Sequence, residues 1–324
     1  MKRLFACLAA VTLWLVGQGA YAVDLPGPLV DVNWLADNLS KVKVLEIRPD
    51  PDNFKEKPQF VTDKKSGKKK LVEVGGHLPG SVWLDFSKVR TERVIDGKKI
   101  KHLIPEKADF EKLVRSWGVN KGDAIVLVPV GDSIGDLNTA ARVYWQLKYY
   151  GEDRVAILNG GTSAWLAAQK PYSTDLVKPA GGNWAAGAER PQLLATSDET
   201  AKASAGAAQL VDARPIAQHY GLSKSGSVSE YGHIAGSKLA AAELMSKDSG
   251  GATYFLDAGT YRALLGKLGI SETAPTISYC NTGHQAAGLW FVMSEVLGNK
   301  NTKLYDGSMH EWTVEKRPVQ GLKG

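Results

Sequence analysis

The protein has 324 residues, of which 44% are hydrophobic and 23% are charged, a balance typical of folded globular proteins and not of disordered chains. Its 40 basic and 34 acidic residues give a formal net charge of +6, and no stripe of basic and aromatic residues indicates nucleic-acid binding. The length allows two ordinary domains, and after the first thirty residues no apolar run is long enough to span a membrane.

The N-terminus predicts a cleavable signal peptide over residues 1–22. Two basic residues precede an apolar stretch, Leu4–Val16, and Ala20-Tyr21-Ala22 is a small-residue cleavage site. We therefore expect the mature protein to begin at Val23, to be periplasmic or secreted, and to have no stable association with a membrane. An uncleaved anchor helix is the less favoured alternative, because the apolar stretch is short.

Removal of the signal peptide would change the number of cysteines in the protein. Cys7 leaves with the signal peptide, so Cys280 is the only thiol of the mature protein, which can form no internal disulfide. In an oxidising compartment an unpaired cysteine is either buried and inert or reactive, and its own sequence context has to decide between the two.

The mature chain contains an internal repeat, and its first copy corresponds to a domain at residues 23–172. This copy runs in order through "VKVLEIRPD", the turn "GGHLPGS", the amphipathic helix "FEKLVRSWGV", the buried strand "AIVLVPV", a helix that contains Trp145, and "LNGGTSAW". An extra basic stretch in this copy, Thr62–Lys70, predicts a solvated loop.

Residues 173–192, rich in Gly, Ala and Pro, predict a linker, and the second copy forms a domain at residues 193–324. Its matching segments are "AQLVDARPI", "YGHIAGS", "YRALLGKLGI", "PTISYC", a helix with Trp290, and "YDGSMHEW". Strands that alternate with helices at this spacing predict an α/β fold: two tandem domains, each a mainly parallel sheet with helices on both faces.

Cys280 ends the buried strand of the second copy, at the edge where open α/β sheets bind ligands. Asn281–Gln285 predict a turn in which Gly283 fits a sharp bend or a φ > 0 position, and a helix is expected from Ala286 onward. The small residues Ala286–Gly288 are expected to let this helix pack closely on the sheet. Backbone N–H groups of such a turn, together with the helix N-terminus, favour a thiolate over a thiol.

Two chemistries use a turn that holds an anion on sulfur. A phosphatase loop needs an arginine to clamp phosphate, but the five residues between Cys280 and Ala286 include none. A persulfide needs less room and no clamp, since backbone N–H groups suffice. The loop therefore favours sulfur transfer over phosphate hydrolysis.

On these segments the chain resembles the tandem-domain rhodaneses, the thiosulfate and mercaptopyruvate sulfurtransferases. The resemblance rests on "EIRP" and "DARP", on "GHLPGS" and "GHIAGS", and on "CNTGHQA" and "YDGSMHEW", and it covers nearly all of the mature chain. It implies an exported sulfurtransferase in which Cys280 is catalytic and the first domain is silent. In the first copy Val130 takes the matching position, and ten residues instead of five separate it from the matching alanine.

The resemblance also implies the substrate-binding residues. These are expected to be Asn281, Thr282, Gly283, His284, Gln285 and Ala286 of the loop, together with Arg214; we expect no metal and no cofactor. The loop is closest to the "CNAGRQS" form of small periplasmic rhodaneses, with histidine in place of arginine. Asn281 and Thr282 match neither the thiosulfate-specific nor the mercaptopyruvate-specific pattern, so the donor stays open.

Several roles stay open between a functional and a structural interpretation. His284 either offers a cation to an anionic donor or is a solvent-facing loop residue. Arg214 either binds a sulfonate or carboxylate, as the resemblance implies, or pairs with Asp212, and Arg48 presents the same choice in the first copy.

Two matched histidines are expected to be structural. His77 and His233 occupy matched turns, and a copy in the silent domain argues against a catalytic role. His310 is expected beside the rim of the pocket. A zinc site that combines it with His284 and the thiol fits no known ligand spacing.

The predicted reaction is a two-step transfer through a persulfide on Cys280. Its partners are a small anionic sulfur donor and a thiol or cyanide acceptor, with a protein as a further candidate acceptor. The rival functions are a non-catalytic sulfur-carrier or partner-binding module and, less favoured, a phosphatase.

Overall fold

The computed structural model describes residues 23–65, 67 and 69–322. The predicted signal peptide lies outside these residues, so its removal and the export of the protein remain predictions. Across the described residues, no helix has both the length and the apolar character that a bilayer crossing requires.

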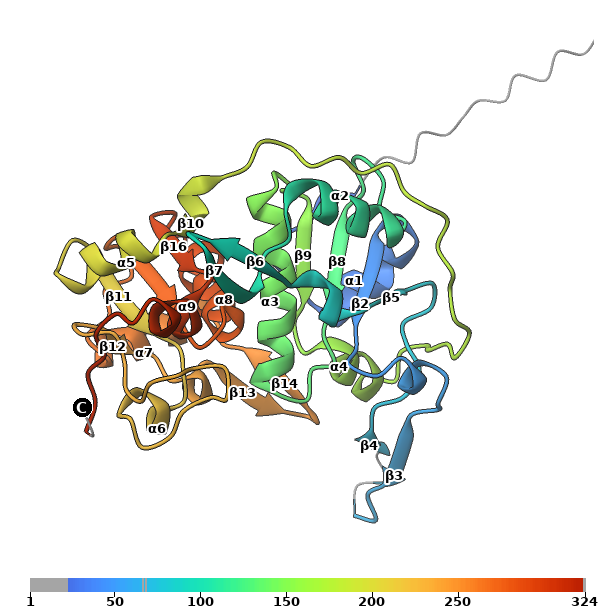
Figure 1. Ribbon diagram of the computed structural model, residues 1–324. Coiled ribbons are helices and arrows are strands. Elements are labelled where there is room, and N and C mark those ends of the chain that lie inside the picture. The colour runs from blue at the N-terminus through green and yellow to red at the C-terminus, as the bar shows by residue number, and fades with distance from the viewer. Residues whose placement is uncertain (1–22, 66, 68, 323–324) are drawn as a thin grey trace, which may run out of the picture.

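The first domain is built on a five-stranded parallel sheet with strand order β1-β9-β8-β2-β5 (Figure 1). Its strands are β1 (Leu29–Val30), β2 (Lys43–Ile47), β5 (Val82–Leu84), β8 (Ile125–Val128) and β9 (Val155–Leu158). The residues of β8 and β9 are all buried, as expected for central strands that helices cover on both faces.

The second domain repeats this topology strand for strand. Its sheet has the order β10-β16-β15-β11-β12, and every pairing is again parallel. The strands are β10 (Leu194–Ala195), β11 (Gln209–Asp212), β12 (Lys238–Leu239), β15 (Thr276–Tyr279) and β16 (Thr302–Tyr305). The predicted fold class and the internal repeat are therefore confirmed.

The helices also correspond between the domains. The first domain contains α1 (Val32–Asn38), α2 (Lys107–Ser116), α3 (Ile134–Tyr149) and α4 (Gly161–Ala167). The second contains α5 (Ser197–Ser204), α6 (Ile216–His219), α7 (Ala258–Lys267), α8 (His284–Phe291) and α9 (Ser308–Val314). A single π-helical turn, Val292–Val296, continues α8.

The two domains meet along α3 and α8, which pack against each other (Figure 1). Trp145 on α3 and Trp290 on α8 are buried in one apolar core that includes residues of both domains. Gly288 was expected to bring α8 close to its sheet. Instead it faces α3, where an added Cβ would lie 1.8 Å from Asn138 Oδ1. The missing side chain thus serves the contact between the helices.

Each domain extends a β-hairpin to the other. The hairpin of β6 (Thr91–Ile95) and β7 (Lys98–Leu103) reaches α9, where the Lys101 N–H donates to His310 Nε2 at 3.1 Å. The hairpin of β13 (Ser246–Ser249) and β14 (Ala252–Phe255) reaches the first domain, where the Thr253 N–H donates to the Gly131 carbonyl at 2.8 Å. Each domain therefore both provides a hairpin to the other domain and receives one from it.

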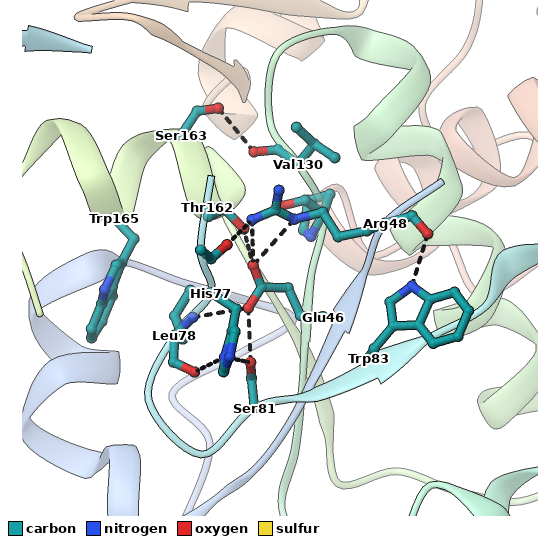
Figure 2. A network of polar contacts seen from close by, with 12 residues as sticks. Glu46, Arg48, His77, Leu78, Ser81, Trp83, Val130, Thr162, Ser163 and Trp165 are labelled. Atoms are coloured by element: carbon teal, nitrogen blue, oxygen red, sulfur yellow. Dashed lines mark hydrogen bonds and ion pairs between the residues drawn. The ribbon is translucent and has the colours of Figure 1, made fainter. Parts of the chain in front are cut away.

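The "EIRP" and "DARP" segments form equivalent buried ion pairs. In the first domain Arg48 Nη2 donates to Glu46 Oε1 at 2.9 Å, and the other carboxylate oxygen accepts from the Leu78 N–H and the Ser81 hydroxyl (Figure 2). Thr162 supplies a further hydroxyl to Glu46 (Figure 2). Arg48 is therefore structural, because its guanidinium anchors the end of β2 to the following turn.

The matched histidines anchor the same turns to the end of each domain. His77 pairs with Ser173 in an isolated antiparallel bridge, and its Nδ1 and Nε2 face the carbonyls of Leu78 and Asp175. His233 pairs in the same way with Gln320. Both histidines are structural, as the repeat predicts.

Two segments differ in form from what the sequence predicts. The basic loop is part of a projecting hairpin of β3 (Gln59–Thr62) and β4 (Lys69–Glu73) (Figure 1), in which Lys64, Lys65, Lys69 and Lys70 are exposed. The linker has little regular structure but is fixed to the first domain: Trp184 is buried, and its carbonyl accepts from Arg115 Nε at 2.7 Å.

Candidate active site

Cys280 directly follows β15, at the carboxyl end of the central strand of its sheet. Its counterpart in the first domain is Pro129, not Val130 as the sequence suggests. In β2, Glu46 pairs with Val128, and in β11 the matching Asp212 pairs with Tyr279, so the next residues correspond. The alignment of the two copies from sequence was shifted by one residue, because the insertion after this position obscures which residues correspond.

The loop after Cys280 consists of Asn281–Gly283, and α8 begins at His284, two residues earlier than expected. Gly283 adopts φ 72°, as predicted. A Cβ at this position would lie 2.6 Å from Arg142 Nη1 and 2.7 Å from the Asp306 carbonyl. Glycine is therefore required both by the backbone conformation and by the close approach of its neighbours.

Ser308 holds the loop from the side of α9. Its hydroxyl oxygen accepts hydrogen bonds from the N–H groups of Cys280 at 3.0 Å and Gly283 at 3.2 Å, and its proton is donated to the Tyr305 carbonyl. Ser308 has φ 51°, a left-handed conformation that a serine rarely adopts. The "YDGSMHEW" segment thus shapes the loop through a residue that the sequence did not single out.

The N–H of Gly283 is therefore part of the framework. The other expected contributors, Asn281, Thr282, His284, Gln285 and Ala286, have backbone N–H groups with no acceptor among the described residues. These five groups belong to the turn that directly follows Cys280 and to the first turn of α8. They can donate to a small anion held on sulfur.

The thiol itself is enclosed. Cys280 is 1% exposed and belongs to the core that joins the domains. Only a small reactant can approach such a sulfur, and the choice between an inert and a reactive thiol then depends on the polar groups around it.

His284 is neither the cation nor the solvent-facing residue that the sequence allowed. Its ring lies between the domains, 5.3 Å from the ring of Phe86, with Nε2 2.9 Å from Thr139 Oγ1. Because Thr139 donates its own proton to the Gly135 carbonyl, His284 donates from Nε2. Burial and the charges of Arg90 and Arg142 lower the pKa of His284 to about 3, so it is neutral near pH 7.

Arg214 takes the structural role that the sequence left open. It donates to both carboxylate oxygens of Asp212 and to the Gly232 carbonyl. Burial alone would destabilise the charged guanidinium, but the carboxylate outweighs this effect and raises the pKa of Arg214. The loop side chain of Asn281 is also engaged, since its Nδ2 donates to Gln218 Oε1 at 2.8 Å.

Two segments of the chain, residues 31–168 and 196–315, match the family model described as the rhodanese-like domain. The chain belongs to the rhodanese family. A protein of Haloferax volcanii with the provisional name thiosulfate sulfurtransferase is 30% identical over 242 residues, 73% of this chain and 80% of its own length.

Two other rhodanese relatives extend over most of the chain. The sulfur carrier protein TtuD of Thermus thermophilus is 27% identical over 303 residues, 89% of this chain and 94% of its own. The crystal structure of SseA from Escherichia coli, titled as a 3-mercaptopyruvate sulfotransferase, superposes with a TM-score of 0.68 at 23% identity. It covers 87% of this chain and 98% of that chain, which supports the fold.

The matching loop of the first rhodanese domain carries no cysteine, and two N–H groups of this loop and the helix start after it are bound by nearby side chains. This loop, residues 130–133, is one residue longer than Asn281–Gly283, and the following helix α3 extends further at its N-terminus than α8 does, so most of the inserted residues lengthen the helix. The N–H of Asp132 donates to Asp136 Oδ2, and the N–H of Asp136 donates to Ser133 Oγ. Local side chains therefore occupy these donors, and two carboxylates oppose an anion.

The first rhodanese domain instead contributes contacts to the loop after Cys280 in the second, and the sequence did not reveal them. Arg142 of α3 is completely buried, pairs with Asp306 Oδ1 at 2.5 Å and donates to the Gly283 carbonyl at 3.2 Å. Arg90 interacts electrostatically with Cys280. The "silent" domain thus supplies positive charge to a thiol in the other half of the chain.

His310 links the two rhodanese domains beside the loop. Its Nε2 accepts from the Lys101 N–H, and its Nδ1 donates to the Ser227 carbonyl at 2.7 Å. Within the described part of the chain, no cluster of three or more His, Cys, Asp or Glu side chains is arranged to hold a metal ion.

Proposed function

We propose that this rhodanese is a sulfurtransferase that moves a sulfane sulfur through a persulfide on Cys280. The observation that carries the proposal is the thiol at the end of β15, followed by a turn and helix start with five backbone N–H groups that have no protein acceptor among the described residues. Relatives named for thiosulfate sulfurtransfer and sulfur carriage support the same chemistry.

In the first step the Cys280 thiolate attacks the outer sulfur of thiosulfate. A new S–S bond forms, the S–S bond of the donor breaks, and sulfite leaves with the bonding electron pair. The charge of the thiolate passes to the terminal sulfur of the persulfide, where the free N–H groups of the loop can stabilise it. The N–H groups held by Ser308 keep the loop in position.

In the second step a thiol or cyanide attacks the terminal sulfur. The S–S bond of the persulfide breaks and returns the electron pair to Cys280, which regenerates the thiolate. Because the thiol is almost fully buried, the proposal favours small donors and acceptors, or a protein acceptor that presents an extended thiol.

Intact-protein mass spectrometry after incubation with thiosulfate or mercaptopyruvate tests this proposal. We expect a gain of one sulfur atom that cyanide removes, and none in Cys280→Ser. The donor that produces the gain identifies the substrate. If neither donor adds sulfur to the wild-type protein, or if the serine variant gains it equally, the proposal fails.

A sulfur carrier is the second candidate, because the sulfur carrier protein TtuD is similar over 94% of its length. A carrier would gain sulfur on Cys280 but release thiocyanate from cyanide no faster than Cys280→Ser. Steady-state thiocyanate release at a rate well above that of the variant supports the enzyme instead.

We further propose that the protein acts after export. N-terminal sequencing of the protein from the cell envelope of its host is expected to begin at Val23. Recovery of the intact N-terminus from the cytoplasmic fraction alone would contradict export and would leave the chemistry at Cys280 unaffected.

A further inference from the structure

Arg90 of the first domain is placed over the catalytic loop of the second. It follows the 3-10 helix Phe86–Val89 and precedes β6. Its guanidinium carbon lies 4.8 Å from the centre of the Phe86 ring, which in turn packs against the ring of His284 at the start of α8. The aromatic contacts fix the position of the guanidinium.

Arg90 differs from the two other arginines near the thiol in having no carboxylate partner. Arg142 pairs with Asp306, and Arg214 pairs with Asp212. Among the described residues Arg90 makes no hydrogen bond or ion pair, and its Nε is buried without an acceptor. Burying a guanidinium nitrogen without a hydrogen-bond acceptor lowers the stability of the fold. We therefore infer that a bound ligand supplies the acceptor for Arg90 Nε.

The charge of Arg90 interacts with the thiol. Burial and the neighbouring Arg142 lower the pKa of Arg90, whereas Cys280 and Asp306 oppose that shift. Arginine nevertheless stays protonated in proteins. A permanent positive charge without a partner is thus held, through Phe86 and His284, at the start of the helix that follows the thiol.

Arg90 is also reachable from outside. It lines a pocket of about 380 Å³ between the start of β6 and α2, together with the basic side chains of Lys88 and Lys112. Asp109 is the acidic residue of this pocket. An anion that enters the pocket meets two lysines and then the guanidinium.

We propose that Arg90 binds the anionic group of the sulfur donor, a sulfonate or carboxylate, and positions its outer sulfur at Cys280. The identity of the bound anion as a sulfur donor rests on the proposed function; the binding of anions by Arg90 does not. Arg90 is then a substrate-positioning residue supplied by the domain that lacks a reactive thiol.

Alkylation of Cys280 tests this inference without sulfur transfer. Iodoacetate and iodoacetamide react with a thiolate in the same way, with loss of iodide, but only iodoacetate is anionic. Rates would be followed by mass spectrometry of the peptide that contains Cys280. Because an interaction with a charged group contributes about a factor of ten, we expect Arg90→Met to lower the iodoacetate-to-iodoacetamide rate ratio about tenfold.

Lys98→Gln is the matched control, because Lys98 is an exposed residue of the same hairpin and its loss removes one charge. It should leave the ratio nearly unchanged. An unchanged ratio in Arg90→Met, or an equal fall in both variants, would overturn the proposal.

The iodoacetamide rate shows whether the site of the variant is still folded, and a variant in which this rate changes severalfold would be replaced by Arg90→Gln. The kinetics of thiosulfate then separate the two proposals. A higher KM with a similar kcat in Arg90→Met supports donor binding. A fall of the alkylation ratio in a protein that gains no sulfur would keep the anion site and reject the donor.

Discussion

Ser308 and Gly283 shape the loop around Cys280 from opposite sides, and both depend on left-handed backbone. Glycine takes this conformation without strain, whereas a serine does so at a cost of about 1–3 kcal/mol. The serine gains two hydrogen bonds from the loop in return. In the first domain the equivalent position is Gly161, with φ 58° and no hydroxyl. The unusual serine therefore belongs to the domain that carries the thiol.

Ser308→Ala should lower the sulfurtransferase activity by about one to two orders of magnitude, because the freed N–H groups of Cys280 and Gly283 allow the loop to shift. Loss of a buried acceptor should also lower the free energy of unfolding by about 1–3 kcal/mol. Thiocyanate release and chemical denaturation measure the two effects.

Ser308→Gly separates strain from hydrogen bonding. Glycine relieves the left-handed strain, so this variant should be more stable than Ser308→Ala, yet its activity should be equally low. An active glycine variant would show that the hydroxyl does not position the loop.

At the scale of the elements, the difference between the two domains lies at the start of α3 and α8. Both helices follow the central strand of their sheet, but α3 begins with Ser133 and Asp136 as caps, whereas α8 begins after Gly283 with no side-chain cap. Side-chain caps satisfy the N–H groups at a helix start. An uncapped start leaves those groups for a ligand.

The double substitution Pro129→Cys and Cys280→Ser tests this explanation. It places a thiol at the structural equivalent of Cys280, but two of the following N–H groups are occupied by side chains and two carboxylates repel an anion. We expect no thiosulfate-dependent gain of sulfur beyond that of Cys280→Ser alone. A persulfide at position 129 would show that the register, and not the cap, keeps the first domain silent.

The strands, helices and repeat were predictable because hydrophobic periodicity and turn residues are local signals, and the two copies support each other. The place of Gly283 was predictable for the same reason. Arg142 and Arg90 were not, since their proximity to the loop results from the packing of one domain on the other. Arg142 donates to the carbonyl of a residue 141 positions away, and no local pattern encodes such a contact.

Polar contacts at the scale of the whole molecule reinforce the shared apolar core. Arg142 and Asp306 form a buried ion pair across the domain boundary, and the second oxygen of Asp306 accepts from the Ile104 N–H at 2.8 Å. Removal of one partner from a buried pair leaves a charge without compensation. The catalytic loop and the domain interface therefore depend on the same two side chains.

Arg142→Met should lower the free energy of unfolding by about 3–5 kcal/mol, because it leaves the Asp306 carboxylate buried and unpaired. Arg262→Met, which breaks an exposed pair with Glu272, should cost about 0–1 kcal/mol. Denaturant unfolding of both variants provides the comparison. Equal losses would mean that the pair at the interface contributes no more than a surface contact.

The reciprocal hairpins also have a consequence for the history of the chain. Each half contributes a β-hairpin that forms hydrogen bonds with the other half. Neither half alone therefore contains all the contacts around the end of its own sheet. Deletion of the first half would remove part of the core that buries Cys280 and would open this sulfur to water and to oxidants, which convert an exposed thiolate to sulfenic acid. Because each half depends on contacts from the other, loss of one half would destabilise the other. Selection for the proposed reaction at Cys280 therefore also preserves the first half.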